Sequence, residues 1–309
     1  MNLPTKVKIR DVAPRDGFQS WPEPVPTEKK LEVISSLMVA GVKEIETTSF
    51  VSPKAVPQMA DAAKVMAAVD RDGVNHAALV PNLKGAQLAL EAGADQLMVV
   101  ISASESHNKA NFNRTIAQSL ADLEPIFSLA AEKGAGVFGA TAVAFGCPYQ
   151  GDVPEEDVLR LVEAYVDYGA HALGLADTTG MATPDRVESL VSRIRDRFPD
   201  KELMLHLHNN RGTAMANLLV GLTSGATIFD TALGGIGGCP NVPQAAGNLA
   251  TEDVVYMLEE LGVATGIDLV ALIKAAHNLE KILGRMLPGQ VMKSGPRDPK
   301  LASDLCGIH

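Results

Sequence analysis

The chain has 309 residues, with 37 acidic against 27 basic side chains and a formal net charge of −10 at pH 7. This length suits one large α/β domain, and the acidic balance excludes a general nucleic-acid binder, which needs a basic face. Three scattered cysteines indicate no disulfide framework, and neither an apolar leader nor a membrane-length apolar run is present. We therefore expect a cytoplasmic protein that does not enter a membrane.

Short β-rich runs alternate with longer stretches of helical periodicity along the chain. Strands are predicted at residues 7–13, 44–50, 76–80, 96–101, 137–145 with the preceding glycine, 171–177, 203–209 and 227–233. Helices between them include residues 28–41, 154–169 and 183–198. This alternation is typical of βαβ units with parallel strands, and eight units favour a closed (β/α)8 TIM barrel. An open doubly wound sheet is the alternative, but no GxGxxG turn follows the first strand.

The chain continues beyond the eighth strand with more elements than a barrel needs. A glycine-rich loop at residues 234–248 is followed by helical patterns at 251–262 and 268–284, so at least one helix is an appended element. The tail at 288–309 is spotted with proline and glycine and is expected to be at most partly ordered. We predict a single domain over residues 1–309, with the barrel at about 5–250 and the C-terminal helices and tail at about 251–309.

Polar side chains gather where the predicted strands end. In a (β/α)8 barrel the active site lies at the carboxyl ends of the strands, which meet at one mouth. The candidates follow strand one, lie within strand two, end strands six and seven, and occupy the loop after strand eight. They are Arg15, Asp16, Glu46, Asp177, His206, His208, Cys239 and Asn248.

The motif HLHNNRG places His206 and His208 two residues apart at the end of an apolar run. Side chains at positions i and i+2 of a strand share a face, so both imidazoles point to the same side. Two satisfied core histidines are the alternative, but the pairing at a strand end favours metal binding. A carboxylate from another strand, such as Asp16, would complete a site of nitrogen and oxygen ligands with open positions.

The pair Arg15–Asp16 carries little information alone, because a surface ion pair or a strand-end cap explains it equally well. At a barrel mouth, however, a buried arginine needs an anion, and an oxyanion forming on a substrate is one such partner. Glu46 fits two interpretations, a structural carboxylate paired with a barrel arginine or a positioned partner of Arg15, and both can hold.

Cys239 lies between glycine and proline in GGCPN. Glycine permits tight turns and close backbone approach, so a small buried turn residue is one interpretation. A thiol on a mobile loop that donates or accepts a proton is the other. The residues themselves leave these two alternatives open.

Several motifs together resemble the 3-hydroxy-3-methylglutaryl-CoA lyase family, within the superfamily of metal-dependent barrel lyases and condensing enzymes that includes isopropylmalate synthase. The matching segments span nearly the whole chain. They are APRDGFQ (13–19), EIETTSFVSPKAVPQM (44–59), FGCPYQG (145–151), LADTTG (175–180), HLH (206–208), GGIGGCP (234–240) and GNLATEDVVYML (247–258).

This resemblance implies roles for the residues of the mouth. Asp16, His206, His208 and Asn248 look like ligands of a divalent cation, Mg²⁺ or Mn²⁺. Arg15 looks like the residue that stabilises the enolate formed at the thioester carbonyl. Glu46 and Asp177 look like supporting carboxylates, and Cys239 like a loop thiol in proton transfer. Gln19 and Arg211 are expected to bind the substrate, and a homodimer is expected by analogy.

The implied reaction is a retro-Claisen cleavage of an acyl-CoA. The tertiary 3-hydroxyl loses a proton, the C–C bond breaks, and an acetyl-CoA enolate leaves a keto acid behind. For 3-hydroxy-3-methylglutaryl-CoA the products are acetyl-CoA and acetoacetate.

Three segments depart from the family pattern, all near the mouth where the acyl group and CoA are bound. The histidine pair is followed by residues 209–212 as NNRG rather than DTYG, the loop reads CPNVPQAAGN rather than CPYAxGASGN, and SWPEP follows RDGFQ. A lyase for a related thioester such as citramalyl-CoA is therefore an alternative.

Two other classes rank lower. A condensing enzyme would carry GxGERxGN in the last loop and often a C-terminal regulatory domain, whereas this chain has GIGGCP there. A barrel that binds without catalysis would have lost some of the mouth residues, and all of them are present.

Overall fold

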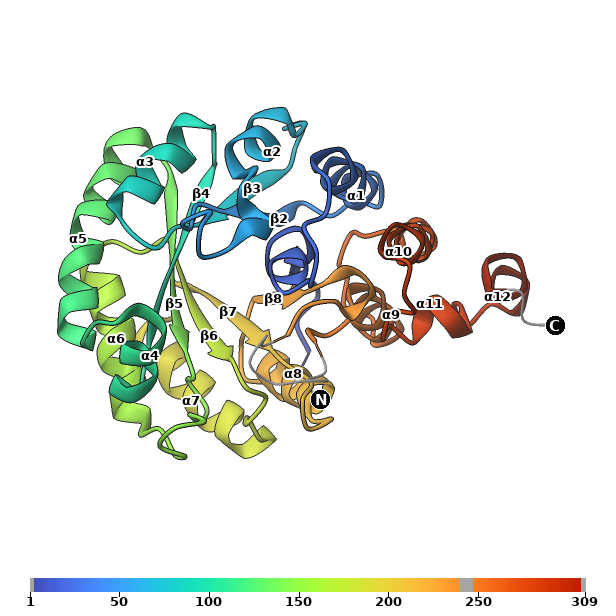
Figure 1. Cartoon of the computed structure of the whole chain (residues 1–309). Helices are drawn as coiled ribbons and strands as arrows, with labels where there is room; N and C mark the ends of the chain where they lie inside the picture. Colours follow the sequence, from blue (N-terminus) through green and yellow to red (C-terminus); the bar gives the residue numbers. More distant parts are fainter. Residues whose placement is uncertain (1–2, 239–246, 307–309) are drawn as a thin grey trace.

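The computed structural model describes residues 3–238 and 247–306. Eight parallel strands form a closed barrel in which each strand pairs with the next and β8 pairs with β1 (Figure 1). The strands are β1 (Lys8–Asp11), β2 (Glu44–Ser49), β3 (Asn75–Leu79), β4 (Gln96–Ser102), β5 (Gly136–Ala142), β6 (Ala172–Asp177), β7 (Glu202–Leu207) and β8 (Ile228–Thr231). The predicted (β/α)8 barrel is confirmed.

Helices surround the barrel on its outside (Figure 1). They are α1 (Thr27–Val39), α2 (Ala62–Ala68), α3 (Leu83–Glu91), α4 (Glu105–Phe112), α5 (Ile116–Lys133), α6 (Glu155–Asp167), α7 (Pro184–Arg197), α8 (Ala214–Thr223), α9 (Thr251–Glu260), α10 (Leu269–Leu283), α11 (Val291–Ser294) and α12 (Pro299–Cys306). Short turns of other helix types are η1 (Ala13–Gly17), η2 (Pro57–Met59) and η3 (Leu233–Gly235). The predicted helices at 28–41, 154–169 and 183–198 correspond to α1, α6 and α7.

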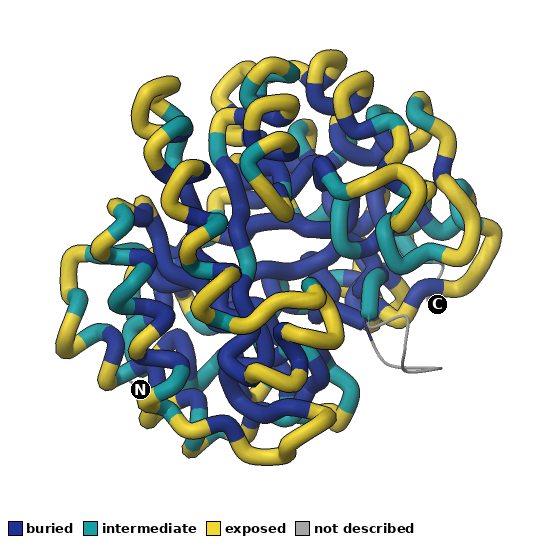
Figure 2. The backbone as a smooth tube through the Cα atoms, turned by 60° about the vertical axis from the view of Figure 1, so that its left-hand side comes forward, coloured by how far each residue is buried: buried dark blue, intermediate teal, exposed yellow. Residues whose placement is uncertain are grey.

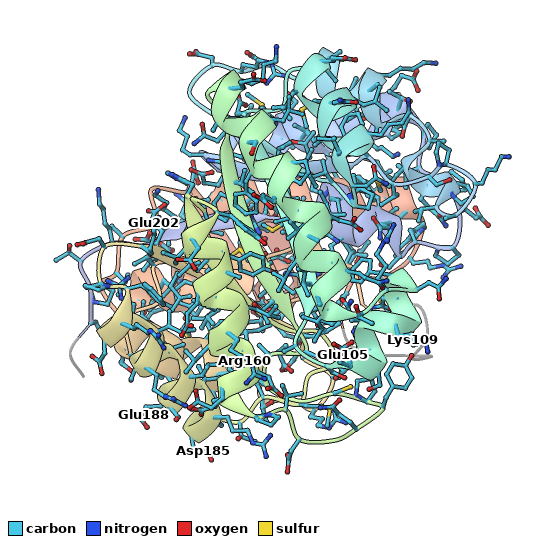
Figure 3. All side chains as sticks on the ribbon, turned by 90° about the vertical axis from the view of Figure 1, so that its left-hand side faces the viewer. Glu105, Lys109, Arg160, Asp185, Glu188 and Glu202 are labelled. Carbon is cyan, nitrogen blue, oxygen red and sulfur yellow. The ribbon has the colours of Figure 1, made fainter. Side chains whose placement is uncertain are left out.

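The apolar residues form two clusters that hold these layers together. The larger cluster lies between strands and helices, and the smaller one fills the barrel interior with Met98, Phe138, Met204 and their neighbours. The strands are buried on both faces, whereas the helices expose their outer sides (Figure 2). Charged side chains such as Arg160 and Glu188 cover those outer sides (Figure 3). The amphipathic helices thus bury one apolar stripe against the sheet.

Four predicted strands end two or more residues early, at Asp11, Ala142, Leu207 and Thr231, and the first two of these ends have a local cause. The run at 7–13 leaves the sheet after Asp11, because η1 turns the chain into the mouth. The run at 137–145 leaves the sheet after Ala142, because Val143 adopts a left-handed conformation with φ 52°. Its N–H donates to Thr178 Oγ1 at 2.9 Å instead of to a strand. Apolar composition could not reveal either turn.

The C-terminal part contains more helix than we predicted. Both α9 and α10 appear as expected, and residues 288–306 also contain α11 and α12, which the proline and glycine content did not predict. Val291, Met292 and Ala302 are buried, because α11 packs on α9 and α10, and α12 on α10 and α11. These packing contacts stabilise helices in a segment whose proline and glycine content disfavours them. In Figure 1, α12 lies farthest from the barrel.

Across the described ranges, every helix is too short or too polar to cross a lipid bilayer.

Candidate active site

Six of the predicted site residues meet at the carboxyl ends of β1, β2, β7 and β8. Glu46 lies in β2, the two histidines end β7, and the others lie on the loops after β1 and β8. They are Arg15, Asp16, Glu46, His206, His208 and Asn248. Residues more than 200 positions apart in sequence are thus in contact because the barrel closes.

His206 and His208 point to the same side of β7, as their spacing predicts. Their Nε2 atoms are 2.9 Å apart, and their rings are tilted with centroids separated by 4.9 Å. Both side chains are buried. His208 leaves the regular strand and bridges to Asn248 across the mouth. This geometry presents two imidazole nitrogens to one point.

Asp16 reaches the histidines because the loops after β1 and β8 touch each other. The Val12 carbonyl accepts the N–H groups of Arg15, Asp16 and Gly17, which forms the tight turn η1. A Cβ atom on Gly17 would lie 2.5 Å from the side chain of Ile236, so only glycine allows this approach. The turn therefore directs the Asp16 carboxylate into the mouth.

The residues of this corner fit a divalent cation. One ligand atom each from Asp16, His206 and His208 lies within 4.8 Å of the others. Asn248 Nδ2 donates to Asp16 Oδ2 at 2.7 Å and to the Ile236 carbonyl at 3.1 Å. Its buried Oδ1 has no hydrogen-bond partner within residues 3–238 and 247–306, and this atom could ligate a metal. We call Asp16, His206, His208 and Asn248 the metal corner.

Arg15 is held between two carboxylates beside the metal corner. Its Nη1 donates to Asp16 Oδ1 at 2.8 Å, and its Nη2 lies 2.6 Å from Glu46 Oε2. Burial lowers the pKa of Arg15, but the charges of Glu46 and Asp16 outweigh burial and raise it. Glu46 is fully buried and is the ion-pair partner of Arg15, as one of our two interpretations expected.

Charge and burial set the protonation of the metal corner. Burial raises the pKa of Asp16, but Arg15 and the two histidines outweigh it and lower the pKa to about 2. Burial and the charge of His206 lower the pKa of His208 to about 4. Burial lowers the pKa of His206, but the hydrogen bond and charge of Asp230 raise it above its usual value. At neutral pH Asp16 is therefore ionised and His208 neutral, the forms that bind metals.

Asp177 and Arg211 are occupied by the loops around them. The two Asp177 oxygens accept the N–H groups of Met181 at 2.7 Å and Ala182 at 3.1 Å. Arg211 is exposed, and its Nη1 donates to the carbonyls of Thr179 at 2.8 Å and Gly180 at 2.9 Å. Both side chains thus hold the loop after β6, and their predicted parts in catalysis and substrate binding stay predictions.

Two further site residues stay predictions. Gln19 is partly exposed, and its Oε1 accepts a hydrogen bond from Ser49 Oγ at 3.0 Å, next to the loop that carries Asp16. Cys239 lies outside the described residues.

Arg10 and Asp230 were missing from our predicted site. Asp230 Oδ2 lies 3.0 Å from Nδ1 of His206, and Arg10 forms an ion pair with the same carboxylate at 2.8 Å. Asp230 is the one charged residue in the run TIFDTAL, and that contrast is the signal that could have revealed it. Arg10 lies in VKIRDVA beside Lys8 and Asp11, so its charge does not stand out in the sequence.

Comparisons with known proteins agree on one family. The HMGL-like profile matches residues 6–279. Hydroxymethylglutaryl-CoA lyase of Bacillus subtilis is 44% identical, over 95% of this chain and 100% of its own length. (R)-citramalyl-CoA lyase of Chloroflexus aurantiacus is 46% identical, over 96% of this chain and 97% of its own. The structure of an HMG-CoA lyase from Acinetobacter baumannii with coenzyme A and 3-methylmalate superposes with a TM-score of 0.91 at 44% identity, covering 96% of this chain and 97% of that one.

Proposed function

Because the chain belongs to the HMGL-like family, we propose that it is a divalent-metal-dependent carbon–carbon lyase for a 3-hydroxyacyl-CoA. The preferred substrate is 3-hydroxy-3-methylglutaryl-CoA, which yields acetyl-CoA and acetoacetate. The observation that carries this proposal is the metal corner, with Arg15 beside it and an Asn248 amide oxygen that has no partner among the residues the structure describes. A bound Mg²⁺ or Mn²⁺ supplies Lewis acidity toward the substrate oxygens.

Arg15 stabilises the negative charge that develops on the thioester carbonyl oxygen as the C–C bond breaks. A guanidinium has five N–H groups, and the contacts with Asp16 and Glu46 leave others to donate to the substrate. The two carboxylates also fix its orientation before the substrate arrives, so little reorganisation accompanies the reaction. In this proposal Glu46 positions Arg15, and Cys239 and Asp177 serve proton transfer.

Citramalyl-CoA is the second candidate substrate. The Chloroflexus relative is named for this thioester and covers nearly the whole chain. The same cleavage of citramalyl-CoA releases acetyl-CoA and pyruvate, because its acid part is one methylene shorter. The metal corner and Arg15 serve either substrate, since the bond that breaks lies between the same functional groups.

A pair of coupled assays distinguishes the two substrates. The purified protein is incubated with each thioester and Mg²⁺ or Mn²⁺ under a thiol reductant, and acetoacetate and pyruvate are each measured by their NADH-linked dehydrogenase. Acetoacetate formation that EDTA abolishes supports the preferred substrate. Pyruvate formation alone would transfer the proposal to citramalyl-CoA and keep the mechanism. Cleavage of either thioester at full rate in EDTA would contradict the metal requirement.

Other features of the proposal come from the sequence alone. A cytoplasmic location, a homodimer and a single domain across residues 1–309 stay predictions. Cell fractionation, light scattering of the purified protein and limited proteolysis measure them.

A further inference from the structure

Arg10, Asp230 and His206 form a connected row of charged and polar side chains inside the barrel. They lie on the neighbouring strands β1, β8 and β7, and the strand register places Arg10 beside Asp230 and His206 beside Asp230. Arg10 Nε donates to Asp230 Oδ1 and its Nη2 to Oδ2, each at 2.8 Å. Asp230 Oδ2 lies 3.0 Å from His206 Nδ1.

This row is buried at a cost that stability alone does not explain. Arg10 is 1% exposed and Asp230 is 3% exposed. Removing both charges of a buried ion pair from water is expensive, and apolar residues of similar size are often as stable or more stable. The two-pronged contact and the Phe138 ring, 4.8 Å from the Arg10 guanidinium carbon, offset part of this cost. The charges are therefore better explained by what they do to His206.

The carboxylate determines which nitrogen of His206 carries a proton. An ionised Asp230 can only accept a hydrogen bond, so Nδ1 of His206 must be the donor. Nε2, which lies 2.9 Å from Nε2 of His208, then faces the metal corner. His208 offers the contrast, because its buried Nδ1 has no hydrogen-bond partner among the described residues. Of the two histidines, His206 therefore has a carboxylate bound to the ring nitrogen that faces away from the metal corner.

We propose that Arg10 and Asp230 are a positioning pair for His206: Arg10 holds the Asp230 carboxylate, and Asp230 fixes the orientation of the ring with its proton on Nδ1, so that Nε2 is available to a metal. This inference rests on the metal site proposed above. Partners of this kind behind a ligating histidine typically contribute about 10- to 100-fold in metal affinity.

The first test measures the Mn²⁺ affinity of the full-length protein, by electron paramagnetic resonance of free Mn²⁺. An amide at position 230 can donate to Nδ1, which moves the histidine proton to Nε2 and blocks the ligand nitrogen. Asp230→Asn is therefore expected to weaken Mn²⁺ binding by about 10- to 100-fold. Arg10→Gln, which frees the carboxylate, is expected to lower the affinity less, and Arg10→Lys to restore part of that loss.

Asp61→Asn is the matched control. Asp61 forms an ion pair with the buried Lys30 at 2.5 Å on the outside of the barrel. It is distant in sequence from the histidines and does not contact them. This variant is expected to lose thermal stability as the positioning variants do, but to keep wild-type Mn²⁺ affinity. Equal Mn²⁺ affinity in Asp230→Asn and wild type, or an equal loss in Asp61→Asn, would overturn the positioning role.

A second measurement uses the metal-free wild type and needs no variant. Nitrogen-15 spectra of the histidine-labelled, metal-free wild type report which ring nitrogens are protonated. A protonated Nδ1 on His206 is expected, and a bare Nδ1 would overturn the inference. If the wild type shows the protonated Nδ1 but binds no Mn²⁺, the proposed function fails while the contact between Asp230 and His206 stands. The two failures are therefore distinguishable.

Discussion

The metal corner and the loop after β6 contain similar side chains with different tasks. In the metal corner, Asp16 and the histidines contact side chains from other strands and leave ligand atoms directed at one point. Around the β6 loop, Asp177 and Arg211 bind backbone groups of residues 179–182. A carboxylate at the mouth of the barrel thus faces other side chains in one place and binds loop backbone in the other. The partner makes the difference, because a carboxylate lone pair that accepts a hydrogen bond from a backbone N–H is not available to a metal ion.

Replacing a histidine of the metal corner should have the largest effect. His208→Ala removes a ligand nitrogen and is expected to weaken Mn²⁺ binding by more than the roughly 100-fold typical of an outer partner. Titration with Mn²⁺ checks this, with His171→Ala as control, since His171 is exposed beside Glu202 at the far end of β7. Unchanged affinity in His208→Ala would remove this residue from the ligand set.

Replacing Arg15 should lower the rate of the reaction without lowering the affinity for the metal. Arg15→Gln shortens the side chain and removes its charge, and we expect kcat to fall by about 100- to 1,000-fold. Mn²⁺ affinity should remain close to that of the wild type, because Arg15 is not a ligand. Steady-state kinetics and Mn²⁺ titration of the same preparation give both values. A parallel loss of affinity and rate would mean that Arg15 acts by holding Asp16.

Asp177, at the end of β6, should contribute to the pH dependence of the free energy of unfolding. Burial raises the pKa of Asp177 from 3.8 to about 6 in the folded protein. Between about pH 4 and 6 the folded state then binds more protons than the unfolded state, so the free energy of unfolding falls as pH rises. Asp177→Asn cannot titrate and should flatten this part of the profile.

Denaturant unfolding of the metal-free protein at several pH values measures this slope. Asp177→Asn should also lose about 1–3 kcal/mol at pH 7, because one of the two loop N–H groups loses its acceptor. A variant with the wild-type slope would assign the titration to other groups. A variant with wild-type stability but no activity would show that Asp177 acts in the reaction, as proposed above, rather than in holding the loop.

The smallest effect is expected at Arg211. Its partly buried hydrogen bonds to two carbonyls contribute about 1 kcal/mol, so Arg211→Gln should lower the melting temperature slightly and leave Mn²⁺ affinity unchanged. A large rise in KM without a change in stability would instead show that Arg211 binds the acyl-CoA. That result would make the β6 loop part of the substrate site.

The fold could be predicted from the sequence because periodicity is a local property. Alternating strand and helix periods define the eight units, and the i, i+2 spacing of His206 and His208 places both on one face whatever else the chain does. Active sites of (β/α)8 barrels lie at the carboxyl ends of the strands, which predicts where the functional side chains meet. The sequence did not predict helices α11 and α12, because packing contacts stabilise them in a stretch rich in proline and glycine.

Only the tertiary structure shows which residues that are distant in sequence contact each other. Asp16 and Asn248 are 232 positions apart, and Arg10 and Asp230 are 220 apart. These contacts depend on the register between strands and on the closure of β1 against β8, which no local pattern encodes. The sequence by itself determined that Asp16, His206 and His208 lie near strand ends. The closed barrel decided which of them face one another, and therefore which lone pairs remain for a metal and a substrate.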